Sequence, residues 1–417
     1  MITNFSLIKF FFFLFIFFSF DTFALNYPKP QARPEIKKKE FHDVFEQIRK
    51  QNWIMAITLA DDYNNKNLSS YIRWLDITRP GSQHNFDYLT NFYQNHKYWP
   101  KQKVLFEKIE SSITKNTPDQ KVLEWFKLNP PTTSKGAIDF LEFKTKSGKN
   151  FNKTSEIKKI WINKNLTFRQ QKYFIKKYNK FWGNDDNWNR FKRLLNEGKH
   201  VSARRTLNRI YGDYRKLGEA QLALSRRSPN VSALIGKVPE RLKNDPGLIY
   251  ERMRWRRKAK LPTAADFLYN PPEKIENVRN WWINARVVVR RLINKKKFLG
   301  AYRILKNHNL PLTEDSGREA EWLAGWVAIH HLKKPTKSIE HFKNVYENTP
   351  NESMKAKAAY WISEANGIIN QKNEEVIWLK IASKNKFSFY GQNASIKLGN
   401  FKFKKEKKIL LKPDNVD

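Results

Sequence analysis

The chain has 417 residues, of which 40% are hydrophobic and 14% aromatic, and this composition predicts a folded protein because disordered chains are poor in aromatic residues. Lys and Arg outnumber Asp and Glu by 79 to 40, and the resulting net charge of +39 would attract nucleic acid, anionic lipid or an acidic cell-wall polymer. No Cys is present, which excludes a disulfide framework, a zinc–thiolate site and acylation at a Cys.

The N-terminal segment predicts export. Lys9 precedes the apolar run from Phe10 to Phe20, and Thr22–Ala24 fit a signal-peptidase cleavage site. The run is too short to cross a bilayer as a helix, which needs about 20 residues. We therefore expect a signal peptide at residues 1–24 and a mature protein that is soluble outside the cytoplasm, with a retained anchor as the alternative. Residues 25–40 are rich in Pro and Lys and predict a flexible lead-in.

Helical patterning begins at Phe41 and continues to about residue 399. Pro residues recur at intervals, where each would end one helix or begin the next, and few stretches show the period of two that strands require. The sequence predicts an all-α fold without β-sheet, a superhelical solenoid or ring of stacked, tetratricopeptide-like α-hairpins. We expect one continuous domain at 41–399 and a charged tail at 400–417.

The better patterned repeats lie at 313–399. Trp322 and Trp326 fall one helical turn apart, while Ala324, Gly325 and Ala328 leave a neighbouring face small enough for another helix to approach closely. Alternation of bulky aromatic and small residues is typical of stacked helical hairpins. Such hairpins form a curved scaffold, which functions by binding a partner on its concave surface. The positions of Trp322, Ser338, Phe342 and Pro350 also match a tetratricopeptide-like unit of about 34 residues.

Arginines recur on several of the expected helices and are the candidate binding residues. If these helices stack, the guanidinium groups could line one surface and pair with carboxylates or phosphates of an anionic wall polymer. The alternative is that several of them lie between helices as packing and ion-pair partners. The candidates are Arg204, Arg205, Arg226, Arg227, Arg252, Arg254, Arg256 and Arg257.

No residue pattern points to catalysis, a metal or a cofactor. Glu352 and Ser353 follow Pro350 and Asn351, so we interpret them as a helix start, where Glu and Ser interact well with the helix dipole. The histidines at 330, 331 and 341 lack a carboxylate that would complete a ligand face, and we interpret them as ordinary surface side chains. Glycine-rich phosphate loops and nucleophile elbows are absent.

The ordered series of these blocks resembles the superhelical, U-shaped region of soluble lytic murein transglycosylases of Gram-negative bacteria, in their alphaproteobacterial form. The resemblance rests on Leu222–Arg227, Asp245–Arg257, Trp281-Trp282, Glu321–Ala328, Ala358–Trp361, Phe389–Gln392 and Leu398-Gly399. It implies a periplasmic protein that acts on peptidoglycan glycan strands. We expect glycan strands or a wall-bound protein as partners, and the export signal argues against nucleic acid. Such enzymes cleave between N-acetylmuramic acid and N-acetylglucosamine without water, and one Glu serves as acid and base while a 1,6-anhydro ring closes.

In that family the catalytic Glu belongs to a lysozyme-like domain that follows the helical region. The chain continues only about 18 residues beyond Gly399, whereas a domain needs at least about 50 residues. We therefore expect this sequence to lack the catalytic domain and to release no anhydro-muropeptides alone. The competing hypothesis is a non-enzymatic, tetratricopeptide-like periplasmic adaptor that binds a protein or cell-wall partner.

Overall fold

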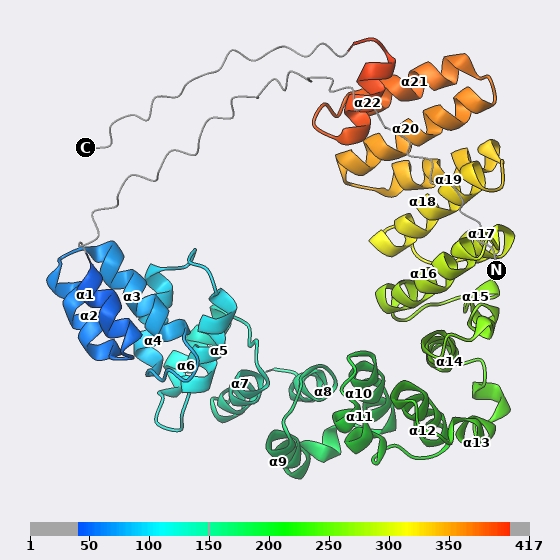
Figure 1. The fold of residues 1–417 in the computed structure, drawn as a ribbon. Coiled ribbons are helices and arrows are strands. Elements are labelled where there is room, and N and C mark those ends of the chain that lie inside the picture. The colour runs from blue at the N-terminus through cyan, green and yellow to red at the C-terminus, as the bar shows by residue number, and fades with distance from the viewer. Residues whose placement is uncertain (1–40, 149–150, 401–417) are drawn as a thin grey trace, which may run out of the picture. The chain divides into compact units, whose positions relative to one another are not determined.

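The computed structural model describes residues 41–148 and 151–400, where all regular structure is helical and no strand occurs (Figure 1). The all-α class predicted from the sequence is thereby confirmed. The predicted signal peptide, the lead-in and the tail beyond Asn400 lie outside the described residues. None of the described helices is both long and apolar enough to span a membrane. The chain divides into two compact units between Thr117 and Pro118.

The first three helices of the first unit pack around a small aliphatic core. Val44, Ala56 and Ile72 are fully buried there, and Leu68 lies against them. Asn52 and Asn65 begin two of the helices by accepting hydrogen bonds from backbone N–H groups of the first turn, which those helices would otherwise leave unpaired. The helices are α1 (His42–Arg49), α2 (Trp53–Asp62), α3 (Lys66–Thr78), α4 (Phe86–Asn95) and α5 (Gln102–Ser112).

The second unit holds the remaining helices. Its first part consists of α6 (Asp119–Leu128), α7 (Ser134–Lys146), α8 (Lys153–Asn163), α9 (Phe168–Tyr178), α10 (Asn184–Asn196), α11 (His200–Leu207), α12 (Asp213–Arg226) and α13 (Val231–Gly236). It continues with α14 (Pro246–Lys258), α15 (Asp266–Tyr269), α16 (Val278–Asn294), α17 (Phe298–Lys306), α18 (Asp315–His330), α19 (Pro335–Asn348), α20 (Glu352–Ile368), α21 (Lys372–Ser383) and α22 (Phe389–Lys397). Short 3-10 turns lie at Asn179–Phe181, Glu240–Leu242 and Pro262–Ala264.

Several helix starts lie where the sequence placed the joints. Pro246 and Pro335 occupy the first positions of α14 and α19, where the missing N–H of Pro costs no helical hydrogen bond. Asp245 caps α14 by accepting a hydrogen bond from the N–H of Leu248 at 2.9 Å. Asn351 caps α20, so Glu352 begins that helix as predicted.

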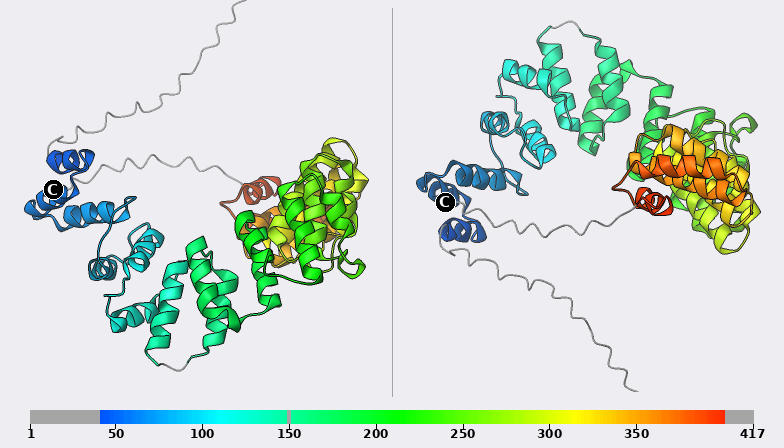
Figure 2. Two further views of the ribbon diagram at one scale, coloured as in Figure 1. Left: turned by 90° about the horizontal axis from the view of Figure 1, so that it is seen from below. Right: turned by 90° about the horizontal axis from the view of Figure 1, so that it is seen from above.

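The second unit is a two-layer stack. Even-numbered helices pack on one another in the series α8, α10, α12, α14, α16 and α18, and α20 packs on α22. Odd-numbered helices fill the other layer: α11 packs on α10 and α12, α17 on α16 and α18, and α19 on α18 and α20. Figure 2 shows the last hairpins, in yellow to red, from two further directions. Because consecutive helices form hairpins, helices two apart run in the same direction, and their C-terminal ends share one edge of the stack.

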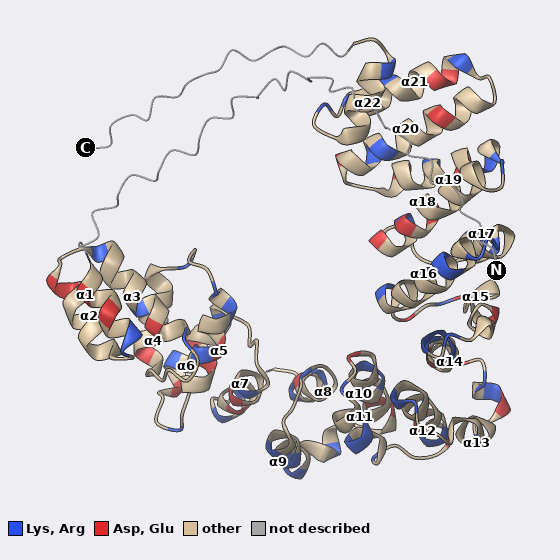
Figure 3. Cartoon of the chain, viewed as in Figure 1, with Lys and Arg blue, Asp and Glu red and all other residues tan. Residues whose placement is uncertain are grey.

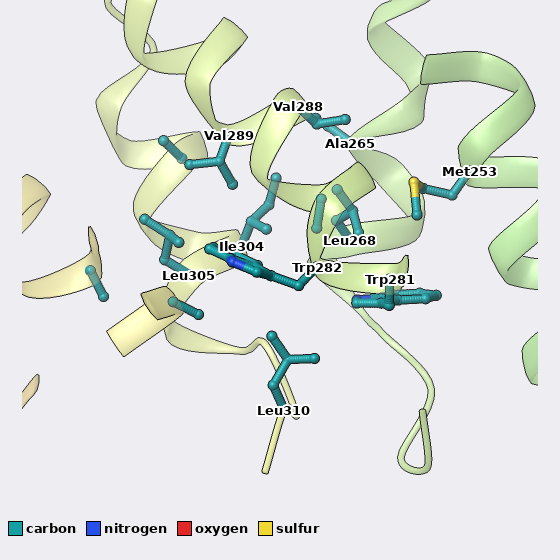
Figure 4. Packing of buried hydrophobic residues seen from close by; sticks show 14 of the residues in the cluster. Met253, Ala265, Leu268, Trp281, Trp282, Val288, Val289, Ile304, Leu305 and Leu310 are labelled. Carbon is teal, nitrogen blue, oxygen red and sulfur yellow. The ribbon is translucent and has the colours of Figure 1, made fainter. Parts of the chain in front are cut away.

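The centre of the second unit is a continuous apolar cluster built from α14 to α18 (Figure 4). The ring of Trp282 lies beside Ile304 and Leu305, so that α16 is held against α17. Trp282 Nε1 donates a hydrogen bond to Glu319 at 2.7 Å, which gives the buried indole its polar partner and joins α16 to α18.

Close helix approach at small residues, predicted from the sequence, occurs between α18 and α19. A Cβ added to Gly325 would lie only 2.6 Å from a ring carbon of Phe342, which is fully buried. Ala324 and Ala328 are also fully buried on α18. The Phe342 ring packs directly against the backbone of α18 at Gly325, which only a residue without a side chain allows. Gly325 therefore sets the distance between α18 and α19.

Candidate binding surface

The helices that carry the candidate arginines are neighbours in space, since α11 packs on α12, and α12 packs on α14. The eight side chains nevertheless do not line one surface. On α14, residues 252 and 256 are four positions apart and share one face of the helix, whereas residues 254, 257 and 258 share another. The prediction of a single arginine-lined surface is therefore wrong, and the candidates divide into three groups.

The largest group gathers where α12, α14 and α16 end. We call it the cationic edge, and it consists of Arg226, Arg227, Arg254, Arg257, Lys258 and Arg291. Figure 3 shows Lys and Arg over much of α14. Arg226, Arg227 and Lys258 are exposed, while Arg254 and Arg257 are half-buried.

Hydrogen bonds fix the middle of the cationic edge. Arg254 Nη1 donates to Ser225 Oγ at 3.0 Å, and the same hydroxyl lies 2.9 Å from His200 Nε2 on α11. Arg291 Nη1 donates to the backbone carbonyl of Arg257 at 2.8 Å and so ties α16 to the end of α14. The guanidinium groups of Arg254 and Arg291 are therefore positioned by contacts with neighbouring helices.

Burial and like charges both act on the cations of this edge. Burial lowers the pKa of the Arg257 guanidinium, and the charges of Arg291 and Arg254 lower it further. Burial also lowers the pKa of Lys258, with Arg254, Arg257 and Arg227 adding to the shift. The pKa of the His200 imidazole is also lowered. Burial is the largest cause, and the charges of Arg254 and neighbouring cations add to it. In each case burial is the main cause and repulsion between neighbouring cations adds to it, so an added anion would stabilise the charged forms.

One buried carboxylate faces these cations. Glu251 Oε2 lies 3.0 Å from Arg254 Nη1, yet burial of the carboxyl raises its pKa despite the opposite charges of Arg254 and Lys258. Among the described residues, Arg257 Nε is buried without a hydrogen-bond acceptor. The edge thus keeps an excess of positive charge and of unused donors.

The helix dipole explains part of this distribution. Cations at a helix C-terminus interact favourably with the unpaired carbonyls there, by about 0.3–1 kcal/mol each when exposed. Acidic residues lie at the opposite ends of two of these helices, with Asp213 in the first turn of α12 and Asp245 at the N-cap of α14, whereas the first turn of α16 holds none. Charge is therefore separated along α12 and α14. The dipole alone does not require six cations on three helix ends.

The second group of arginines packs against an aromatic ring. The guanidinium groups of Arg252 and Arg256 lie 5.0 and 4.9 Å from the centroid of Phe267, on the side of α14 that faces α15. Burial lowers the pKa of Arg256, and the charge of Arg252 adds to the shift. These two side chains fulfil the alternative expectation of packing between helices.

The third group lies on α11. Arg205 Nε donates to Gln171 Oε1 at 3.0 Å and Arg205 Nη2 donates to Ser202 Oγ at 3.0 Å, so this guanidinium ties α11 to α9. Arg204 is exposed, one residue away along the helix. Neither belongs to the cationic edge.

Sequence reasoning missed His200 and Ser225 as members of the site. Neither residue type stands out locally, and both matter because the start of α11 and the end of α12 meet beside α14. The sequence does hold one signal for the site. Arg226 and Lys258 are the last residues of two consecutive helices of one layer, so their side chains lie at the same edge of the stack.

His330 and His331 both contact the ring of Trp326, whereas His341 contacts the ring of Tyr302. His330 contacts the rings of Trp326 and Trp361, and His331 stacks on Phe298 with 4.0 Å between ring centroids. His341 is buried, so its interpretation as a surface side chain is wrong. Within the described part of the chain, no group of three or more His, Cys, Asp or Glu residues could hold a metal ion.

Glu352 lies at the start of α20, as expected. It is exposed and pairs with Lys355 at 2.8 Å within the same helix. Ser353, next to it, is also exposed. This local ion pair accounts for the carboxylate without a catalytic role.

Comparison with known proteins identifies a similar fold. No family model and no curated protein matches the chain. Among solved structures, the chain is similar to the crystal structure of the 70 kDa soluble lytic transglycosylase from Escherichia coli, with a TM-score of 0.55 and 13% sequence identity. The similarity covers 86% of this chain and 57% of that chain. At this level of identity it shows a shared helical fold, and the chain spans little more than half the length of the enzyme it resembles.

Proposed function

We propose that this chain is an exported helical scaffold of the lytic transglycosylase type, which binds peptidoglycan in the periplasm through its cationic edge. The fold shared with a soluble lytic transglycosylase and the signal-like residues 1–24 support this proposal. The observation that carries it is the cluster of Arg226, Arg227, Arg254, Arg257, Lys258 and Arg291, whose charges repel one another and lack enough carboxylate partners.

Peptidoglycan offers the matching chemistry. Its stem peptides carry carboxylates, and a guanidinium binds a carboxylate through two parallel N–H donors. At about 0.15 M salt the screening length is about 8 Å, so cations gathered at three adjacent helix ends act together on one polymer. Binding at this edge would hold a glycan strand by its peptides and leave the sugars accessible.

We assign binding, and no bond cleavage, to the described residues. The resemblance implies that cleavage needs one Glu that first protonates the bridging oxygen and then takes a proton from the muramic acid 6-hydroxyl. The carboxyl of Glu352 is exposed and paired with Lys355, and that of Glu251 is enclosed beside Arg254. The scaffold would present glycan strands to such a Glu.

Co-sedimentation with purified cell-wall sacculi tests the proposal. The chain should pellet with sacculi at low salt and be released as salt increases. A quadruple variant, R226Q/R227Q/R257Q/K258Q, should lose most of this binding. The matched control removes four exposed lysines elsewhere in the second unit, at positions 127, 172, 176 and 237, by substitution with Gln. Equal pelleting of the two variants would contradict a role for the cationic edge and would leave the adaptor hypothesis as the better one.

A further inference from the structure

A separate pocket lies on the opposite edge of the stack, where α18, α20 and α22 begin. Its volume is about 540 Å³, within the range of about 300–1,000 Å³ that is typical of small-ligand sites. Trp322, Lys357, Met354, Ser353, Phe389 and Tyr390 are among the residues that line it. We call it the N-terminal pocket, after the helix ends that form it.

Lys357 is the cation of this pocket that has no anionic partner. Its Nζ lies 3.4 Å from the centroid of the Trp322 ring, and among the described residues no hydrogen bond or ion pair reaches it. Burial lowers the pKa of Lys357, although the charge of Glu319 acts against the shift. A half-buried ammonium group without an acceptor is stabilised by any ligand that brings one.

The carboxylates near the pocket are already engaged. Glu319 accepts hydrogen bonds from Arg286 at 2.6 Å and from Trp282 at 2.7 Å. Asp315 pairs with the buried guanidinium of Arg318. Because Glu319 and Asp315 are paired with other residues, Lys357 is the charged group of the pocket that is available to a ligand.

The remaining wall combines apolar and hydroxyl groups. Phe389 is 69% exposed and lines the pocket, so its ring is accessible to a ligand. Met354 lies beside it, and its flexible thioether adapts to irregular apolar ligands. Ser353 adds a hydroxyl at the start of α20. A simple inorganic anion would use the cation and leave this apolar lining empty.

We propose that the N-terminal pocket binds the free C-terminal carboxylate of a short peptide, with the carboxylate on Lys357 and a small apolar side chain against Met354 and Phe389. This inference rests on the proposed function in one respect, because the stem peptides of peptidoglycan are the periplasmic peptides that fit this description. The N-terminal pocket and the cationic edge would then hold different parts of one wall polymer.

Fluorescence anisotropy with an N-terminally labelled tripeptide that ends in D-Ala-D-Ala tests the inference. The free-acid peptide should bind saturably, and its C-terminal amide should compete at least about tenfold less well, since a hydrogen bond to a charged group is worth roughly one to two orders of magnitude in affinity. K357Q should weaken binding by a similar factor, K357R should keep most of it, and F389A should also weaken it. Excess inorganic phosphate should compete poorly.

The control is K355Q, which removes a cation two positions away that pairs with Glu352 and does not line the pocket. This variant should bind the peptide as the wild type does. No saturable binding, equal binding of acid and amide, or unchanged binding by K357Q would overturn the inference. If the peptide does not bind but the chain still pellets with sacculi through the cationic edge, the inference about the pocket is wrong and the proposed function stands. If the peptide binds but the chain does not pellet with sacculi, the pocket inference stands and the proposed function is wrong.

Discussion

His341 Nδ1 lies 2.6 Å from Glu321 Oε2, at a position where both side chains are buried. The second oxygen of the same carboxylate lies 3.1 Å from His308 Nε2, and His308 Nδ1 accepts a hydrogen bond from the N–H of Leu310. The ring proton of His308 is therefore on Nε2, which donates a hydrogen bond to Glu321. Tyr302 completes the network at 3.0 Å from His341 Nε2. Residues from α17, α18, α19 and the segment after α17 thus meet at one carboxylate.

Substitution of this carboxylate should destabilise the second unit. Glu321 accepts hydrogen bonds from His308, His341 and Asn344, whereas the amide of E321Q has only one oxygen that can accept, so at least one of these donors would lose its partner. We expect a loss of about 2–4 kcal/mol in the free energy of unfolding, measured by urea denaturation. E340Q is the control, since Glu340 is exposed and pairs with exposed Lys337, and it should cost less than about 0.5 kcal/mol.

The same network predicts a dependence of stability on acid pH. Burial opposes ionisation of Glu321, but hydrogen bonds from His308 and His341 outweigh it and lower its pKa from 4.5 to about 2. Because the folded pKa is the lower one, ionised Glu321 stabilises the fold above about pH 4.5, and this contribution is lost as pH falls to about 2. A shift of this size corresponds to roughly 3 kcal/mol. The difference in unfolding free energy between wild type and E321Q should therefore shrink as the pH falls through that window. The difference for E340Q should stay small at every pH. A difference for E321Q that does not change with pH would refute the lowered pKa of Glu321.

Much of the fold was predictable because it depends on local periodicity. Trp322, Gly325 and Ala328 recur at helical spacing, and that spacing defines which face of α18 accepts a neighbour. The burial of His341 was not predictable in the same way. Its partners lie 20 and 39 residues earlier in the chain, at Glu321 and Tyr302, and only the hairpin stacking brings them together.

The close approach at Gly325 gives a second stability test. Alanine gains about 0.5–1 kcal/mol over glycine inside a helix, whereas overpacking a core costs about 1–3 kcal/mol. A Cβ at position 325 would lie 2.6 Å from the fully buried ring of Phe342, so the steric cost should exceed the gain. We expect G325A to destabilise the chain by about 1–2 kcal/mol in thermal or urea unfolding. G236A is the control, because nothing lies within 4 Å of the added atom, and it should be neutral or slightly stabilising.

The candidate site was harder to predict than the fold. Sequence reasoning found the arginine-rich helix α14, and residue spacing alone separates Arg252 from Arg254, but it could not tell which neighbours each face would meet. Membership of the cationic edge depends on which helix ends share one side of the stack. His200 lies beside it only because α11 begins where α12 and α14 end, a relationship between layers that no local pattern encodes.

His200 provides an internal reporter for the charge of the cationic edge. Burial and the charges of Arg254, Arg226 and Lys258 lower its pKa. Removing one of these charges in R226Q should raise the His200 pKa, measured by NMR titration of the imidazole with H200Q used for assignment. Arg204 is exposed on the same helix as His200 and is not among the causes of its shift, so R204Q should leave the pKa of His200 unchanged.

The same titration links the reporter to binding. A polyanion held at the cationic edge would offset the positive charges and should also raise the His200 pKa, whereas an anion bound elsewhere would not. Soluble peptidoglycan fragments should therefore raise it in the wild type and much less in the R226Q/R227Q/R257Q/K258Q variant. An unchanged His200 pKa in the presence of fragments that demonstrably bind would show that they bind at another surface.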